Sequence, residues 1–278
     1  MTVKVVADST CDIPAHLARE LDITVVPIYV VFGEKAYRDR VDLGEEEFYE
    51  RLVHDSLFPS TSVPAPNDFA DVYNRLAEET DQIISIHLTG KESGTYNSAL
   101  LAKELVTKPC RIEVIDSSSV SMGFGMTILA AARKAREGAS LEELVELTRH
   151  YLSKSHLLIM VDTLKYVIKG GRLSKPHGIL GSVLKVRPLL VMREGHLSLS
   201  GVARTRAKAL ERLYEFARSF PKVVEFAVAY TTSHEDAQEL ADRLRAVFPK
   251  ATCHITRVGP SLGTHAGPGA MGVAILEA

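Results

Sequence analysis

The chain is poor in the residues that mark several classes of protein. Its 278 residues include no tryptophan and only three cysteines, and its formal net charge is −2. Cys11, Cys110 and Cys253 lie far apart without a Cys-x-x-Cys pair, so the sequence predicts a reducing compartment and no structural zinc. A net charge so close to zero gives no field that would attract nucleic acid or an anionic membrane.

Long hydrophobic runs and targeting segments are also missing. No apolar run approaches the roughly 20 residues that span a bilayer. Met1–Asp8 runs straight into a predicted strand, without the pattern of a signal peptide. With 46% hydrophobic and 24% charged residues, the composition is that of a globular protein, and the length favours about two domains. We therefore expect a cytoplasmic protein with no stable membrane insertion.

Two nucleotide-binding motifs are incomplete. A P-loop needs glycine five residues before a Gly-Lys pair and Ser or Thr directly after it, whereas Gly90-Lys91 has Ser85 and Glu92 at these positions. Gly123-Phe124-Gly125 follows a predicted strand, but Ile128 stands where the third glycine of a dinucleotide fingerprint belongs. The sequence predicts no nucleotide site.

An enzyme with a serine or aspartate nucleophile is the alternative to a binding protein. Serines, aspartates and His265 are available for a catalytic triad, although no Gly-x-Ser-x-Gly elbow occurs. Asp8 follows the first predicted strand, as in aspartyl-phosphate enzymes, but Thr10 replaces their second acid. A serine hydrolase or phosphatase using Ser93 or Asp8 stays open.

The order of predicted elements indicates an α/β fold with two α/β domains. In residues 1–150, strands alternate with helices, which predicts a parallel sheet flanked by helices. In residues 151–278, Arg187–Met192 and Leu197–Val202 flank the turn signal Arg193–His196, which predicts a hairpin and a mixed sheet. Further predictions are one long strand at Ile23–Phe32, helices at Met126–Arg136 and Ile179–Val186, and a loop at Gly259–Gly269.

The stretch from Gln82 to Val106 is the first candidate for a binding site. Its first seven residues form a short apolar run that predicts a buried strand, and a helical pattern opens at Ser93. A helix that starts directly after a strand presents unpaired N–H groups that favour an anion. Ser93 is a candidate N-cap, and Gly94 allows a ligand to approach the backbone.

Other candidates are neutral donors and cations outside this stretch. Thr61 and Ser62 lie in a proline-rich loop that we expect to be stiff and pre-organised, with Asn67 as the cap of the following helix. Arg172 and His265 add potential positive charge. Together these residues describe a pocket for a carboxylate or phosphate, although an ordinary loop, a helix cap and a surface arginine are the structural alternatives.

The assembled motifs resemble those of the DegV family of fatty-acid-binding proteins from end to end of the chain. The segments that carry the resemblance are Ala7-Asp8-Ser9-Thr10-Cys11-Asp12, Thr61-Ser62-Val63-Pro64, Ser93-Gly94-Thr95-Tyr96-Asn97-Ser98-Ala99, Ile115-Asp116-Ser117, Gly170-Gly171-Arg172-Leu173-Ser174, Val186-Arg187-Pro188 and His265-Ala266-Gly267-Pro268-Gly269. One departure is Ala266, where the family usually has threonine or valine.

The resemblance implies a long-chain fatty acid, such as palmitate, buried between the two domains and no other cofactor. It implies that some members carry the acyl chain for a bacterial fatty acid kinase, whose separate ATP-binding subunit phosphorylates the acid. The carboxylate would be held by Thr61, Ser62, Ser93, Gly94, Arg172 and His265. Arg204 would contact the kinase or the phosphate, unless it only begins a solvated helix. Ile179, Leu180, Val183 and Leu184 are candidates for the wall of the tail site.

Overall fold

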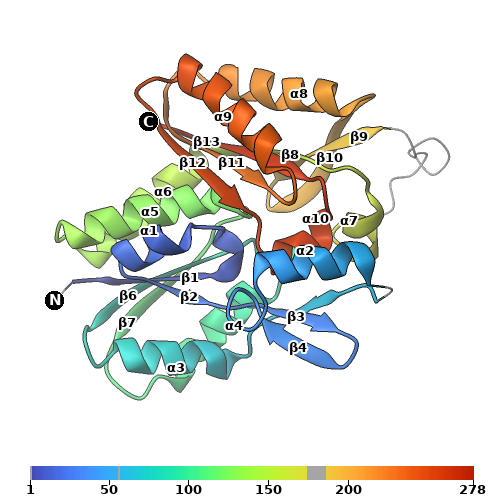
Figure 1. Cartoon of the computed structure of the whole chain (residues 1–278). Helices are drawn as coiled ribbons and strands as arrows, with labels where there is room; N and C mark the ends of the chain where they lie inside the picture. Colours follow the sequence, from blue (N-terminus) through green and yellow to red (C-terminus); the bar gives the residue numbers. More distant parts are fainter. Residues whose placement is uncertain (1, 56, 174–185) are drawn as a thin grey trace.

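The computed structural model describes residues 2–55, 57–173 and 186–278, and it shows the predicted α/β fold (Figure 1). Four strands of the first half form a parallel sheet in the order β2-β1-β6-β7. Their apolar, largely β-branched side chains suit a sheet that is covered on both faces. These strands are β1 (Lys4–Asp8), β2 (Ile23–Val26), β6 (Gln82–His87) and β7 (Arg111–Asp116).

A small antiparallel sheet corrects the prediction of one long strand at Ile23–Phe32. The extended segment breaks at Pro27, which has no N–H for a ladder hydrogen bond. The residues after the break leave the parallel sheet and pair in the order β4-β3-β5. These strands are β3 (Tyr29–Phe32), β4 (Lys35–Arg38) and β5 (Ser60–Ser62).

Six strands of the second half form a mixed sheet in the order β10-β9-β8-β13-β11-β12. β11 and β12 are parallel, and the other neighbours are antiparallel. The predicted hairpin is confirmed, because β9 and β10 pair and turn at Glu194-Gly195, both of which have positive φ. The strands are β8 (Ser155–Met160), β9 (Arg187–Arg193), β10 (His196–Ala203), β11 (Val223–Tyr230), β12 (Thr252–Arg257) and β13 (Met271–Glu277).

The helices cover these sheets in layers (Figure 1). α5 and α6 lie between the parallel sheet and the mixed sheet, α3 and α4 cover the far face of the parallel sheet, and α8 and α9 cover the far face of the mixed sheet. α10 packs between α2 and α7. Helix bounds are α1 (Ala15–Glu20), α2 (Glu45–His54), α3 (Pro66–Leu76), α4 (Thr95–Ala102), α5 (Met122–Arg136), α6 (Leu141–Ser153), α7 (Lys165–Lys169), α8 (Arg206–Arg218), α9 (His234–Val247) and α10 (Pro260–Ala266), with 3₁₀ turns at η1 (Ser9–Cys11) and η2 (Lys103–Leu105).

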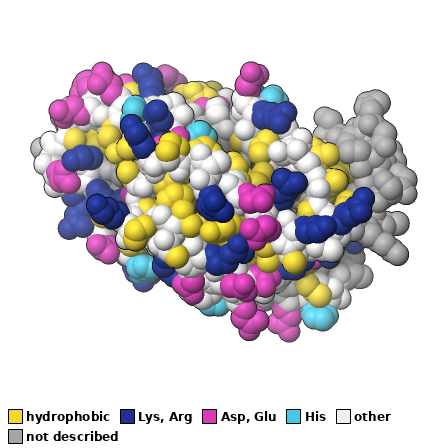
Figure 2. All heavy atoms as spheres, turned by 90° about the horizontal axis from the view of Figure 1, so that it is seen from above, with side chains coloured by type: hydrophobic (Ala, Val, Ile, Leu, Met, Phe, Trp, Pro, Cys, Tyr) yellow, Lys and Arg dark blue, Asp and Glu magenta, His cyan; other side chains and the backbone are white. Residues whose placement is uncertain are grey.

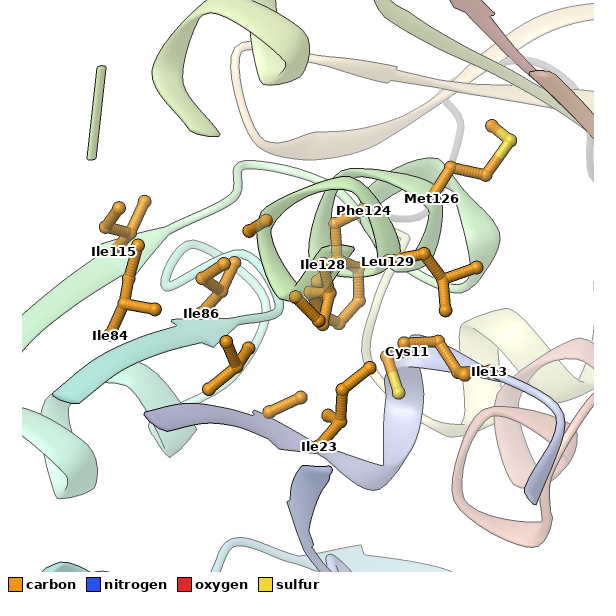
Figure 3. Packing of buried hydrophobic residues seen from close by; sticks show 14 of the residues in the cluster. Cys11, Ile13, Ile23, Ile84, Ile86, Ile115, Phe124, Met126, Ile128 and Leu129 are labelled. Atoms are coloured by element: carbon orange, nitrogen blue, oxygen red, sulfur yellow. The ribbon is translucent and has the colours of Figure 1, made fainter. Parts of the chain in front are cut away.

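α5 joins the two halves through one apolar core. It contacts β1 of the parallel sheet as well as β8, β11 and β13 of the mixed sheet, and a single cluster of buried side chains includes residues of both. Figure 3 shows Phe124 and Ile128 of α5 pointing toward the strands that carry Ile23 and Ile86. A helix that is apolar on all sides is stable only when it is buried on all sides. The space between the sheets is therefore filled by α5 over part of their area.

Three helix predictions need correction. α5 begins at Met122, four residues before the predicted start. Ala65, not Asn67, is the N-cap of α3, because the following proline suits the first helical turn. The predicted loop at Gly259–Gly269 contains α10. Most of the predicted helix Ile179–Val186, including the four candidates for the tail wall, lies outside the described residues.

Charges of both signs are interspersed on the face seen in Figure 2, and no single basic patch dominates it. Among the described helices, none is long and apolar enough to cross a membrane. The same part of the chain holds no group of three or more histidine, cysteine, aspartate or glutamate side chains placed to bind a metal.

Candidate functional site

A mainly apolar cavity lies between the mixed sheet and the loops of the first half. Its volume is about 1000 Å³, solvent at its mouth included. Both halves of the chain line it, so the cavity exists only where they meet. Five of the candidate residues line it: Thr61, Ser62, Ser93, Arg172 and His265.

Two loops that are far apart in sequence meet at the cavity. A Cβ atom built on Gly94 would lie 3.8 Å from Val63 Cγ1, so the start of α4 touches the residue that follows β5. β5 pairs with β3, and its alternation leaves Thr61 half-buried, whereas Ser60 and Ser62 are exposed. Thr61 and Ser62 from one loop and Ser93 from the other all line the cavity.

A hydrogen bond between Thr61 and His265 links the two halves beside the cavity. Thr61 Oγ1 lies 3.0 Å from His265 Nε2, and His265 Nδ1 is buried with no hydrogen-bond partner among the described residues. If Nε2 carries the proton, the imidazole donates to Thr61 Oγ1, and the threonine hydroxyl is then free to donate to a ligand. In the other tautomer, the Thr61 hydroxyl donates its proton to His265 Nε2 and cannot donate to a ligand. An anion beside Thr61 therefore favours the Nε2–H tautomer.

The electrostatics keep His265 neutral. Burial and, secondarily, the charge of Arg172 lower the pKa of His265 from 6.5 to about 3. Burial also lowers the pKa of Arg172, which nearby Glu92 partly opposes, and an arginine keeps its charge at this level. Arg172 Nη1 donates to Gly170 O at 2.6 Å. Arg172 therefore supplies positive charge to the site, and His265 is a neutral imidazole.

Gly170 holds His265 in place by close packing. A Cβ atom at position 170 would lie 2.1 Å from His265 Nδ1, a separation that no side chain can occupy. The Gly-Gly-Arg segment thus places a bare backbone against the imidazole and an arginine two residues later.

The start of α4 differs from the prediction in one detail. Gly94 is the N-cap of the helix, and Ser93 precedes it. Ser93 Oγ lies 2.9 Å from Thr95 Oγ1 and accepts a weaker hydrogen bond from Thr95 N at 3.3 Å. Gly94 adjoins the cavity without lining it. Ser93 is accordingly anchored on its own helix start while it faces the cavity.

Sequence reasoning missed Glu92, which lines the cavity beside Ser93. Its Oε1 accepts a hydrogen bond from Leu197 N at 3.1 Å and lies 3.3 Å from His196 Nδ1. Nothing in the local pattern identifies a contact with a hairpin that begins about 100 residues later. Only its place in the chain, next to Ser93, was a signal.

Two buried carboxylates, also missed, hold the start of α10. Asp12 Oδ1 accepts a hydrogen bond from Gly259 N at 2.9 Å, and Asp39 Oδ2 accepts a longer one from Ser261 N at 3.4 Å. Burial raises the pKa of Asp39 to about 7. Because α10 has only seven residues, these contacts stabilise the helix that carries His265.

Of the two residues considered for an enzyme, Ser93 lines the cavity and Asp8 does not. The Asp8 carboxylate is buried, and it accepts hydrogen bonds from Thr10, from Leu88 N and from His87. His87 Nε2 lies 2.7 Å from Ser85 Oγ, which completes an Asp-His-Ser chain with 0% exposure at each member. Neither Asp8 nor Ser85 lines the cavity. Asp8 and Ser85 are therefore not in contact with the space inside the cavity.

Arg204 lies outside the cavity. It follows β10 directly and is exposed. Arg204 therefore lies on the surface of the protein.

Comparison with known proteins identifies the family. A family model described as "Uncharacterised protein, DegV family" matches residues 2–278. The chain belongs to the DegV family. A DegV domain-containing protein of Caldanaerobacter subterraneus is 37% identical over 277 residues, which are 98% of this chain and 97% of the relative.

Solved structures of this family share the fold. One is described as DegV, a fatty acid binding protein from Bacillus subtilis; it is 31% identical, covers 100% of both chains and superposes with a TM-score of 0.92. Another is the Streptococcus pneumoniae fatty acid kinase (Fak) B3 protein loaded with linoleic acid, at 25% identity, 100% coverage of both chains and a TM-score of 0.87. The resemblance seen in the sequence is confirmed.

Proposed function

We propose that this DegV family protein binds a long-chain fatty acid such as palmitate, with the carboxylate at Thr61 and Ser93 and the tail in the apolar cavity. One observation carries the proposal: hydroxyl groups, a neutral histidine and an arginine converge at one end of a cavity whose remaining walls are mainly apolar. A fatty acid likewise has a polar carboxylate at one end and an apolar hydrocarbon tail. Relatives described as fatty-acid-binding proteins share the fold, which supports the proposal.

The head group would be held mainly by neutral donors. Thr61 and Ser93 would donate from their hydroxyls, and Arg172 would contribute its charge. Ser62 and the N–H of Gly94 would complete the set from the cavity rim. Hydrogen bonds to a charged group contribute about 1.5–3 kcal/mol each.

The tail would supply most of the affinity. About a dozen buried methylenes at roughly 0.8 kcal/mol each give on the order of 10 kcal/mol before the entropic cost of binding. The polar cluster would therefore fix the orientation of the acid in the cavity.

The chain would not act as an enzyme alone. We infer that in the cytoplasm it presents the bound carboxylate to a separate ATP-dependent fatty acid kinase, as the relationship to the Fak B3 protein suggests. Arg204, exposed after β10, would contact that partner or the transferred phosphate. The incomplete P-loop at Gly90-Lys91 agrees with a division in which the partner binds ATP.

The decisive experiment is mass spectrometry of the purified protein, under native conditions and after solvent extraction. We expect one fatty acid per chain, and re-binding of palmitate after delipidation. Ser93→Ala should keep the fold by circular dichroism and bind palmitate more weakly. A protein that holds no fatty acid and takes up none after delipidation would refute the proposal.

A further inference from the structure

The floor of the cavity contains a row of three residues from three neighbouring strands. Gly272 of β13 pairs with Ile159 of β8 on one side and with Ala229 of β11 on the other. Residues paired in this way lie on the same face of a sheet. All three line the cavity, and two of them have little or no side chain. The middle of the row is therefore bare backbone.

The next row on this face is mostly covered, and of its three residues only Leu157 lines the cavity. Two residues further along the strands, Leu157, Ala274 and Ala227 pair in the same order. They belong to the apolar cluster that includes α5, and α5 contacts all three strands. The cavity also reaches Val120, just before α5 begins. The row through Gly272 thus lies at the boundary between the part of the mixed sheet that lines the cavity and the part that α5 covers.

The head-group end lies in the opposite direction. His265 and Ala266 line the cavity from α10, and Ala270 lines it just before β13. From Ala270 to Gly272 the strand rises about 6–7 Å. A tail that starts at His265 and follows the floor therefore passes Ala270 before it reaches Gly272, which borders the covered row.

A side chain fits at position 272 without disturbing the backbone. A Cβ atom there would lie 3.5 Å from Leu158 O, 3.6 Å from Ile159 Cγ1 and 3.7 Å from Leu157 Cδ1, which are ordinary contact distances. The backbone has no positive φ that demands glycine. Glycine at this position is thus required neither by the turn of the chain nor by a close neighbour.

We propose that Gly272, together with Ala229, sets the length of the acyl chain that the cavity accepts. This inference rests on the proposed function and adds a selectivity for acyl chain length. The small residues at positions 229 and 272 leave the space in which the last methylenes of a long tail would lie. A larger side chain at either position would end the cavity sooner and favour shorter fatty acids.

The test measures affinities of delipidated wild-type protein, Gly272→Ala, Gly272→Val and Ala229→Val for saturated acids from dodecanoate to octadecanoate. Each methylene excluded from the cavity should weaken binding about four-fold. We expect Gly272→Val to lose affinity mainly for the longest acids, with the preferred length moved toward dodecanoate. Gly272→Ala should give a smaller shift in the same direction.

Gly201→Val is the matched control. Gly201 lies in β10, a Cβ atom there meets nothing within 4 Å, and the residue does not line the cavity. Valine suits a strand, so neither glycine-to-valine change opposes the local structure. Ala229→Val probes the same row from another strand if Gly272→Val does not fold.

The outcomes separate this inference from the proposed function. Wild-type binding with an unchanged length preference in Gly272→Ala and Ala229→Val would overturn the inference alone. An equal loss for every chain length in folded variants would also overturn it, because the added side chain would then block the whole tail. A wild-type protein that binds none of the acids would overturn both.

Discussion

Replacing Thr61 by valine tests the head-group site most directly. Valine has nearly the same shape and suits β5, so the change removes the hydroxyl and little else. The hydrogen bond from that hydroxyl to a carboxylate contributes about 1.5–3 kcal/mol, which corresponds to a roughly 10- to 160-fold increase in Kd. Because the proposed tail contacts would contribute on the order of 10 kcal/mol, binding should be weakened rather than abolished.

The loss has a second component inside the protein. Thr61 Oγ1 is the partner of His265 Nε2, so Thr61→Val leaves both ring nitrogens without a hydrogen bond among the described residues. An unpaired buried polar group costs about 1–3 kcal/mol. We therefore also expect a lower free energy of unfolding for the ligand-free variant.

Ser60→Ala is the matched control for this prediction. Ser60 lies in the same strand, is exposed and does not line the cavity. Titration of delipidated protein with palmitate, followed by calorimetry or displacement of a fluorescent fatty acid, gives the three Kd values. If Thr61→Val binds palmitate as tightly as Ser60→Ala and wild type, the carboxylate does not lie at Thr61.

Two further predictions concern His265. Gly170→Ala should destabilise the protein by about 1–3 kcal/mol in urea unfolding and weaken palmitate binding, because its Cβ would displace the imidazole. Gly201→Ala, in β10 with nothing within 4 Å of the added Cβ, should do neither. Equal behaviour of the two variants would contradict the packing argument. The pKa of His265 is about 3 in the folded protein and 6.5 in the unfolded chain, so between these pH values only the unfolded chain binds the proton. The contribution of His265 to the free energy of unfolding should therefore fall as the pH falls from 6.5 toward 3, by up to about 1.4 kcal/mol per pH unit. Urea unfolding at pH 7, 5.5 and 4.5 should show this loss in wild type relative to His265→Asn, whereas a constant difference between them would mean that the histidine is not buried as neutral.

Elements with strong periodicity were predictable from the sequence. The apolar run at Gln82–Leu88 and the turn signal at Arg193–His196 each specify local geometry that packing then reinforces. The break at Pro27 was misjudged because the apolar residues continue on both sides of it. The sequence pattern reports which residues are buried, and both strands contain buried residues, but the pattern does not show that the strands belong to different sheets.

α10 could not have been predicted by the same means. Its seven residues include proline and glycine, and an isolated helix of this length is unstable in water. It forms because Asp12 and Asp39 accept hydrogen bonds from its first N–H groups. Both carboxylates come from the first half of the chain, more than 200 residues away. Their contribution depends on tertiary structure alone.

The candidate site was accessible to sequence reasoning only through the family resemblance. Hydroxyls near prolines and a serine before a helix are common, and nothing local indicates that Thr61 meets His265. Glu92 was missed for the same reason, since its partners belong to the hairpin β9–β10. Contacts between the two halves are set by how the sheets pack on α5.

The geometry of the proposed head-group site follows from the junction that holds the two halves together. Arg40, largely buried, donates hydrogen bonds to Ser9 O, to Asp12 and to Arg257 O, and so connects the end of β1 with the residues that precede α10. A Cβ at Gly259 would lie 2.8 Å from the Arg40 guanidinium, so the backbone there must be bare. Burying these charges is costly unless they are paired, and pairing demands one arrangement of the groups. The same arrangement sets where α10 begins, and therefore where its imidazole meets Thr61.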